Sequence, residues 1–184
     1  MRIIFGKFKG RTITSPNSKF IRPMTDRVRV TLFDILSNKI DFEGIKVIDL
    51  YSGSGSLGLE CLSRGADEVL FVERNFVIYK NLVKNIQSLD VEAQCKIFKM
   101  EATKFSRLEE HKKYDLIFAD PPFFKDDIYE VTENLQANKF SIDDGLIIIQ
   151  RSIQTRGKDK LHFEVEPFKI IGDSCLYEIT NQKL

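Results

Sequence analysis

The stretch 46-KVIDLYSGSGSLGLECLSR-64 decides the fold of this 184-residue chain. An apolar strand over residues 46–50 leads into a glycine-rich turn at 52–56, and a helix over 57–64 ends at Gly65. Glycines let a backbone turn tightly and approach a ligand, and open α/β sheets bind ligands at the carboxyl ends of their strands. The stretch therefore predicts a ligand site between the first strand and the first helix of such a sheet.

The same alternation of strand and helix continues along the chain. Further strands are predicted at residues 68–72, 95–99, 114–119 and 146–150, with intervening helices from residue 75 to 86 and over 127–138. Such units imply parallel strands with helices on both faces of one sheet. Residues 163–171 and 175–180 both resemble strands, and the short turn between them makes this last pair antiparallel. The fold class is thus α/β, Rossmann-like and three-layered, ending in an antiparallel hairpin that an all-parallel dinucleotide-binding fold lacks.

Length and composition favour a single domain. The chain is 42% hydrophobic and 30% charged, and it has no apolar run long enough to span a membrane. Three cysteines and two histidines are scattered without the spacing of a metal site. We expect a cytoplasmic protein without metal, with residues 1–40 forming a basic extension packed on a core of residues 41–184.

Charge is distributed unevenly along the chain. Residues 1–31 hold eight basic residues and one acid, which leaves 20 basic and 26 acidic residues in the rest. Thr25 or Asp26 can cap a helix in this part whose Val28, Leu32 and Leu36 lie on one face. A basic arm on a mildly acidic body indicates that one end of the molecule holds a polyanion.

The residues around the glycine turn indicate the kind of cofactor. Glu73 ends the second strand, where a carboxylate can bind both hydroxyls of a ribose. Asp49 precedes the glycines and can bind a cationic group, which fits the ammonium of S-adenosylmethionine better than a pyrophosphate. Glu101 and Ala102 follow the third strand, where an adenine edge would lie. Gly53, Gly55 and Gly58 also satisfy the dinucleotide-binding pattern, so a NAD-dependent dehydrogenase stays an alternative.

A second polar loop follows the fourth strand. Asp120, Pro121, Pro122 and Phe123 come directly after the apolar run 114–119. The prolines keep the chain extended as it leaves the sheet. Such a loop can hold carbonyl and carboxylate acceptors and one aromatic ring around a ligand that is flat and bears N–H donors. The loop alone does not name that group, and adenine N6 or a protein amide would also fit.

The linked motifs resemble those of the bacterial small-subunit ribosomal RNA guanine-N2 methyltransferases. The resemblance rests on 22-RPMTDRVR-29, 49-DLYSGSGSLGLE-60, 62-LSRGA-66, 71-FVE-73 and 120-DPPF-123, in this order over nearly the whole chain. It implies a seven-stranded class I methyltransferase sheet, S-adenosylmethionine as methyl donor, and a guanine of 16S ribosomal RNA in the small ribosomal subunit as target. Val30 stands where the family usually has Glu, and Ala or Phe is commoner around Tyr51 and Ser52.

The predicted site residues fall into three groups. The carboxylate of Asp120 and the carbonyl of Pro121 are expected to accept the two N–H bonds of the guanine amino group while Phe123 stacks on the base. The catalytic group is Asp120, Pro121, Pro122 and Phe123. The cofactor group is Asp49, Tyr51, Ser52, Gly53, Gly55, Glu73, Arg74, Glu101 and Ala102. The RNA-binding group is Lys7, Lys9, Arg11, Arg22, Arg27 and Arg29. The main candidates are Arg22, Arg27 and Arg29, but residues on a helix that packs on the body cannot all face RNA, so some of these are expected to be structural or to contact the cofactor. We expect a monomer; an RNA-binding assembly factor without catalysis is the remaining alternative.

Overall fold

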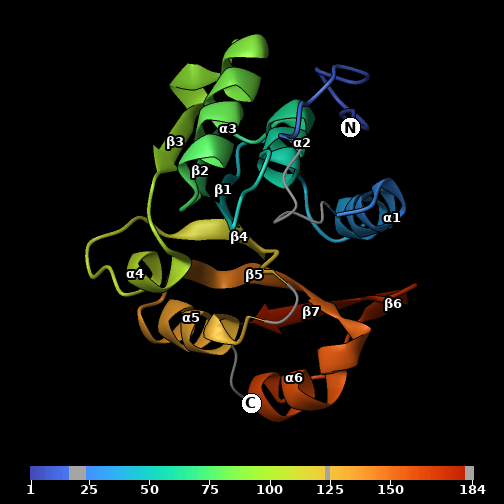
Figure 1. Cartoon of the computed structure of the whole chain (residues 1–184), viewed down its shortest axis with the longest axis vertical. Helices are drawn as coiled ribbons and strands as arrows, with labels where there is room; N and C mark the ends of the chain where they lie inside the picture. The colour runs from blue at the N-terminus through green and yellow to red at the C-terminus, as the bar shows by residue number, and fades with distance from the viewer. Residues whose placement is uncertain (17–23, 123–124, 181–184) are drawn as a thin grey trace.

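The computed structural model describes residues 1–16, 24–122 and 125–180. A seven-stranded sheet forms its centre, with helices on both faces (Figure 1). In chain order the elements are α1 (Asp26–Ser37), β1 (Lys46–Leu50), α2 (Ser56–Arg64), β2 (Glu68–Val72), α3 (Phe76–Ser88), the 3-10 turn η1 (Glu92–Gln94), β3 (Cys95–Phe98), α4 (Ala102–Ser106), β4 (Tyr114–Ala119), α5 (Asp127–Ala137), β5 (Ser141–Ser152), the 3-10 turn η2 (Ile153–Thr155), α6 (Arg156–Phe163), β6 (Lys169–Ile171) and β7 (Ser174–Thr180).

The strand order explains where a ligand can bind. It is β3-β2-β1-β4-β5-β7-β6, with β1 to β5 parallel and β7 antiparallel to both of its neighbours. The chain moves outward from β1 through β2 to β3 and then returns to place β4 on the other side of β1. Such a switch in direction opens a crevice at the carboxyl ends of the strands. We call this side of the sheet the carboxyl edge. The predicted fold class is confirmed.

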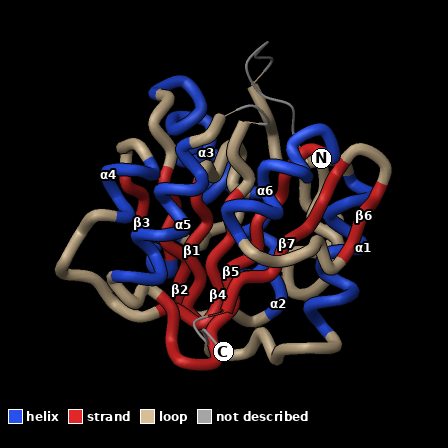
Figure 2. Tube along the Cα trace, turned by 90° about the horizontal axis from the view of Figure 1, so that it is seen from below, coloured by secondary structure: helices blue, strands red, loops and turns tan. Residues whose placement is uncertain are grey.

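Alternating strand residues divide the core into two layers. Val47 and Leu116 belong to a hydrophobic cluster with residues of α1, α2 and α3, whereas Ile48 and Ile117 belong to a second cluster with residues of α4, α5 and α6. Successive side chains of a strand point to opposite faces, so each central strand contributes to both clusters. Figure 2 shows the strands side by side between these helices.

The basic N-terminal segment is anchored to the first of these layers. Ile3, Phe8 and Ile13 are buried in the first cluster. An antiparallel bridge joins Arg2 to Thr12, so the start of the basic extension is a bridged loop rather than a longer ladder. The next predicted element, a helix capped near Thr25, is confirmed: Thr25 Oγ1 accepts a hydrogen bond from the backbone N–H of residue 28 at the start of α1.

One strand prediction is wrong for most of its length. Of residues 163–171, only Lys169–Ile171 forms a strand, while Phe163 ends helix α6 and Glu164 caps it at φ 57°. Residues 156–162 are strongly polar and include a glycine, so the sequence pattern does not reveal this helix. The short helix α4 was not predicted either, and β5 extends beyond the predicted residues 146–150 at both ends. The terminal hairpin itself is confirmed by the antiparallel pairing of β6 with β7.

Candidate functional site

The glycine turn lies at the carboxyl edge of β1 and packs closely on its neighbours. Gly53 and Gly55 adopt left-handed φ angles of 57° and 82°. A Cβ atom on Gly55 would lie 2.4 Å from Leu82 of α3, and one on Gly58 would lie 2.4 Å from Phe71 of β2. Glycine at these positions therefore lets the start of α2 sit directly on the sheet, with its backbone N–H groups close to the crevice.

Two carboxylates hold this turn in place. Asp49 Oδ2 accepts a 3.0 Å hydrogen bond from the N–H of Gly58. Glu73 follows β2 and accepts hydrogen bonds from the N–H of Gly53 at 3.1 Å and the N–H of Asn75 at 2.7 Å. Ser52 joins the turn to β2, since its Oγ accepts a hydrogen bond from the N–H of Val72 at 2.8 Å. Because each carboxylate still has lone pairs, both can also bind groups of a ligand in the crevice.

Other predicted cofactor residues surround the same edge. Arg74 and Glu101 follow β2 and β3 and lie 3.7 Å apart, each about half exposed. Ala102 is buried at the start of α4. Tyr51 has a left-handed φ of 56°. Burial of its hydroxyl and the nearby carboxylate of Asp127 raise the pKa of this phenol. The structure thus brings the nine predicted cofactor residues to one edge of the sheet, while their binding role stays a prediction.

The acceptor loop comes from the strand on the other side of β1. Ala119, the last residue of β4, pairs with Leu50, so Asp120 lies across the crevice from the glycine turn. The backbone N–H of Lys125 donates to the carbonyl of Pro122 at 2.9 Å, and the buried guanidinium of Arg151 donates to the carbonyl of Lys125 at 3.1 Å. Arg151 therefore fixes the far end of the loop. Phe123 lies outside the described residues.

The charges at this edge set it apart from the rest of the sheet. Burial raises the pKa of Asp120 to about 7. Burial also raises the pKa of Asp49 well above its usual range, and the nearby carboxylates of Asp120 and Glu73 raise it further. Burial likewise raises the pKa of Glu73. None of the ion pairs between described residues includes any of these three carboxylates. Such a cluster favours a cationic ligand, because a positive charge would relieve its mutual repulsion.

The predicted RNA-binding residues are separated from this cluster. Lys7, Lys9, Arg11 and Arg27 are exposed. The N–H of Lys7 donates to the carbonyl of Ser63, so this turn lies at the end of α2 farthest from the glycines, about 13 Å away along the helix. The Arg11 guanidinium reaches the last residue of α3. These exposed residues therefore lie away from the carboxylates of the carboxyl edge, and their role in RNA binding stays a prediction.

The prediction for Arg29 needs a correction, and Arg22 lies outside the described residues. Arg29 is 1% exposed; its guanidinium donates to the carbonyl of Arg2 at 2.6 Å and pairs with Asp26 at 2.8 Å. In helix α1 it shares a face with Phe33 and Leu36, at the i, i+4 and i+7 positions that point to the core. This spacing makes Arg29 a residue that anchors the N-terminal segment rather than one that contacts RNA.

Asn85 is a residue of the site's surroundings that the sequence did not single out. It is buried on α3, and its amide donates to the carbonyls of Thr14 and Ser54 at 2.8 and 2.9 Å, while its oxygen accepts the N–H of Thr14 at 3.0 Å. One side chain thus connects the N-terminal segment to the glycine turn. A polar residue on the buried stripe of Ile78, Leu82 and Ile86 was the available signal.

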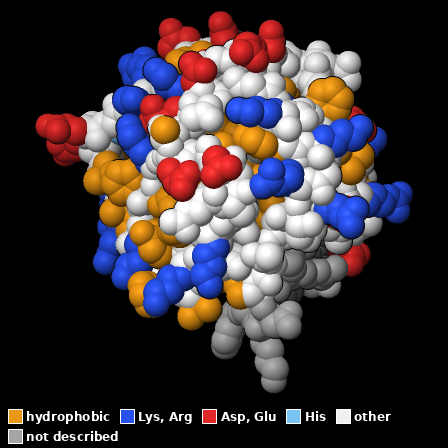
Figure 3. All heavy atoms as spheres, turned by 90° about the horizontal axis from the view of Figure 1, so that it is seen from above, with side chains coloured by type: hydrophobic (Ala, Val, Ile, Leu, Met, Phe, Trp, Pro, Cys, Tyr) orange, Lys and Arg blue, Asp and Glu red, His pale blue; other side chains and the backbone are white. Residues whose placement is uncertain are grey.

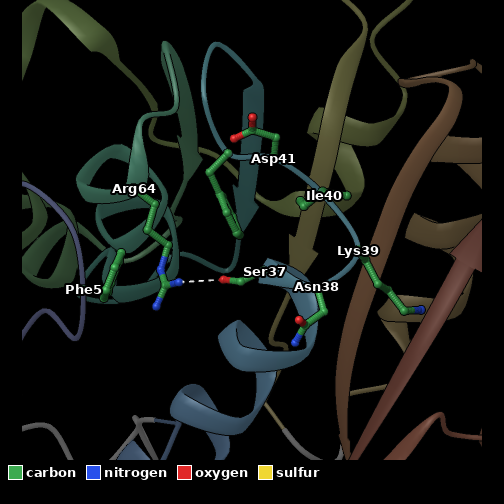
Figure 4. Close-up of a pocket in the computed structure, with 8 residues that line it drawn as sticks. Phe5, Ser37, Asn38, Lys39, Ile40, Asp41 and Arg64 are labelled. Carbon is green, nitrogen blue, oxygen red and sulfur yellow. Dashed lines mark hydrogen bonds between the residues drawn. The ribbon is translucent and has the colours of Figure 1, made fainter.

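A pocket of about 430 Å³ lies elsewhere, at the end of α1. Figure 4 shows Arg64 pointing toward Ser37, to whose Oγ it donates a hydrogen bond at 2.8 Å. The guanidinium also lies within 6 Å of the ring centres of Phe5, Phe33 and Phe42. None of the predicted catalytic or cofactor residues lines this pocket, so it is separate from the site described above. Within residues 1–16, 24–122 and 125–180 no cluster of metal ligands occurs, and no helix is long and apolar enough to cross a membrane.

The sheet and the acidic, glycine-lined crevice together define a methyltransferase of the seven-stranded class. Solved structures agree: that of the proposed methyltransferase yhhF from Escherichia coli superimposes with a TM-score of 0.81, at 28% identity, over 99% of both chains. A Thermus thermophilus protein, TTHA0928, has the same fold with a TM-score of 0.78.

Sequence comparison gives the family. The chain belongs to the family named conserved hypothetical protein 95, whose model matches residues 1–178. It is 32% identical over 154 residues to ribosomal RNA small subunit methyltransferase D of E. coli, covering 84% of this chain and 76% of that relative. The protein of the same name from Haemophilus influenzae is 37% identical over 125 residues, covering 67% of this chain and 64% of that relative.

Proposed function

We propose that this protein transfers the methyl group of S-adenosylmethionine to the exocyclic N2 amino group of a guanine in small-subunit ribosomal RNA. The observation that carries the proposal is the cluster of three carboxylates with raised pKa values around a glycine turn: Asp49 and Glu73, which are buried, and Asp120, which is partly buried. The methyl donor carries a sulfonium and an ammonium, so its charge matches the cluster. A dinucleotide would place a pyrophosphate there and meet repulsion.

Each carboxylate has a distinct part in the proposed binding mode. Asp49, closest to the glycines, faces the ammonium end of the donor. Glu73 faces the ribose hydroxyls, and Arg74, Glu101 and Ala102 border the adenine. When bound, the donor supplies a methyl group activated by the sulfonium charge.

The acceptor loop prepares the amino group for attack. The Asp120 carboxylate and the Pro121 carbonyl accept its two N–H bonds, which draws the nitrogen toward tetrahedral geometry and frees the lone pair that the guanine ring otherwise delocalises. The nitrogen then bonds to the methyl carbon as the carbon–sulfur bond breaks, and the electron pair of that bond stays on sulfur. Positioning and charge complementarity supply the acceleration. The methylated nitrogen is cationic and acidic, and it passes a proton to Asp120 or water.

Two observations support the proposed substrate. The names of the relatives describe methyltransferases of small-subunit ribosomal RNA. The carboxylate and carbonyl acceptors expected at Asp120 and Pro121 match the two N–H bonds of a base amino group. The base must be unpaired or flipped to enter. Cytoplasmic location and a monomeric state accompany this proposal as predictions.

The proposal is tested with tritiated donor, small ribosomal subunits from cells that lack this protein, and mass spectrometry of the nucleosides. The unaltered protein is expected to produce N2-methylguanosine. Asp120→Ala should lower turnover at saturating donor about 10²- to 10³-fold, while the protein still binds the donor, more weakly because the charge is lost. Asp126→Ala is the matched control, since this acid follows the same loop but is exposed and pairs with Lys158. Near-normal turnover of Asp120→Ala, or methylation of another base, contradicts the proposal.

A further inference from the structure

An exposed aromatic ring begins helix α3, directly after the residues that hold the glycine turn. Phe76 is 52% exposed and Val77 is 64% exposed, although both are large apolar residues. Their neighbours Ile78 and Leu82 are buried, so the core-facing stripe of α3 does not include them. The helix contains lysines and no acidic residue. Exposed apolar surface beside positive charge indicates a contact surface rather than a packing defect.

Two ammonium groups from different elements surround this ring. Lys80 Nζ of α3 lies 4.4 Å from the ring centre of Phe76, and Lys99 Nζ, which follows β3, lies 5.1 Å from it. Neither lysine takes part in an ion pair with a described residue. Figure 3 looks onto the end of the molecule where α3 and β3 lie, and there blue Lys and Arg and orange hydrophobic side chains lie among red Asp and Glu ones.

This surface adjoins the carboxyl edge. Val72 pairs with Phe98 at the ends of β2 and β3, and the N–H of Glu73 donates to the carbonyl of residue 98 at 3.1 Å. Phe76 follows β2 and Lys99 follows β3, so both lie just beyond the same edge as the acceptor loop. They are displaced along the sheet from β4 by two and three strand spacings, or about 10 and 14 Å. A strand of RNA whose base enters the crevice can reach them within a few nucleotides.

We propose that Phe76, Lys80 and Lys99 form a docking site for an unpaired nucleotide a few positions along the RNA from the methylated base. The base stacks on the exposed ring of Phe76, and the two lysines turn to the flanking phosphates. Every nucleobase has a face that can stack, so this contact tolerates any sequence. The positive charge and the lack of acids on α3 fit a polyanion better than a protein groove. The inference rests on the proposed function only in taking RNA as the substrate.

The test measures binding of the full chain to a fluorescently labelled, unpaired RNA 20-mer of mixed sequence over a range of salt concentrations. Phe76→Ala should weaken binding about 10-fold, and Phe76→Tyr should retain it, because loss of a stacked base costs this much in other proteins. Val77→Ala is the matched control: it removes an equally exposed apolar side chain one residue away and should leave affinity within about 2-fold. Lys80→Ala combined with Lys99→Ala should lower the slope of log affinity against log salt by about 1.4.

The affinity for S-adenosylmethionine distinguishes this docking site from the cofactor crevice. This affinity should be the same in each variant as in the unaltered protein. The inference is overturned if Phe76→Ala binds RNA as tightly as the unaltered protein, or if Val77→Ala weakens RNA binding as much as Phe76→Ala does. It is also overturned if the affinity for the donor falls together with the affinity for RNA. Because the RNA probe needs no methylation, failure of the proposed guanine reaction and failure of this docking site give different results. If the protein stacks RNA on Phe76 but methylates another base, the docking site is supported and the proposed target is wrong.

Discussion

Two groups of buried carboxylates in this protein differ in their partners. Asp159 of α6 accepts hydrogen bonds from Arg151 at 3.0 Å, Tyr129 at 2.8 Å and Thr155 at 2.7 Å. At the carboxyl edge, Asp49 and Asp120 are held without a cation among the described residues. Burial alone therefore does not mark a functional acid. The acid that the fold leaves without a counter-charge is the one available to a ligand.

Glu60 of α2 belongs with Asp159 in this comparison. Its carboxylate accepts the N–H groups of Ile4 and Phe5 at 2.7 and 3.0 Å and pairs with Arg64 at 2.9 Å. It is fully buried, yet all its interactions are with the protein, and they fasten the N-terminal segment to α2. We infer that paired acids such as Glu60 and Asp159 maintain the fold, while the acids at the carboxyl edge serve the reaction.

The largest expected effect comes from breaking a paired acid. Asp159→Ala leaves the buried guanidinium of Arg151 without its carboxylate, and the free energy of unfolding should fall by about 3–5 kcal/mol. Chemical denaturation measures this change. A loss below about 1 kcal/mol would show that the pair contributes little and would remove the distinction between the two groups.

The next effect concerns pH. The pKa of Asp120 is raised to about 7, so its carboxylate, which the proposed reaction needs, is lost as pH falls below that value. For the free enzyme, kcat/KM for S-adenosylmethionine should rise about 100-fold between pH 5 and 8. The cationic donor favours the charged form, so kcat should reach its plateau at lower pH than kcat/KM. Identical pH profiles for the two parameters would argue against a sulfonium next to Asp120.

The stability of the ligand-free protein should have the opposite pH dependence. An acid with a folded pKa above its unfolded value binds more protons in the native state, so unfolding becomes easier as pH rises from about 4 to about 7. At pH 8, Asp49→Asn should therefore leave the ligand-free protein as stable as the unaltered chain or more so, because its amide oxygen can still accept from Gly58. Donor affinity, measured by calorimetry, should fall about 10-fold with the lost charge. A large drop in melting temperature would place Asp49 with the structural acids.

The smallest effect is expected at the exposed margin of the site. Glu101 lies 3.7 Å from Arg74 with both side chains about half exposed, so Glu101→Gln should change stability by less than about 0.5 kcal/mol. Its proposed contact with the adenine amino group predicts a loss of donor affinity of about 2- to 5-fold. Comparing the donor with an analogue that lacks the adenine amino group tests this contact, since the variant should discriminate between the two less than the unaltered protein does.

The sequence predicted those parts of the site that depend on local pattern. The strand, glycine turn and helix around Asp49, and the acidic residue that ends the next strand, are fixed by short-range spacing. Burial is different, because it depends on segments far apart in the chain. Arg64 is only four residues from Glu60 and Arg151 is eight from Asp159, yet this spacing does not show that these pairs are buried. The charge of Arg29 predicts exposure, although the residue is buried beneath the N-terminal segment.

The most direct test of the central claim is the exchange of protons when the donor binds. Calorimetric titration of S-adenosylmethionine near pH 7, in two buffers with different ionisation enthalpies, counts these protons. If the carboxylate cluster receives a cation, binding should release up to about half a proton from Asp120, and Asp120→Asn should abolish that release. No proton release by the unaltered protein, or the same release by Asp120→Asn, would contradict the assignment of this edge as the donor site.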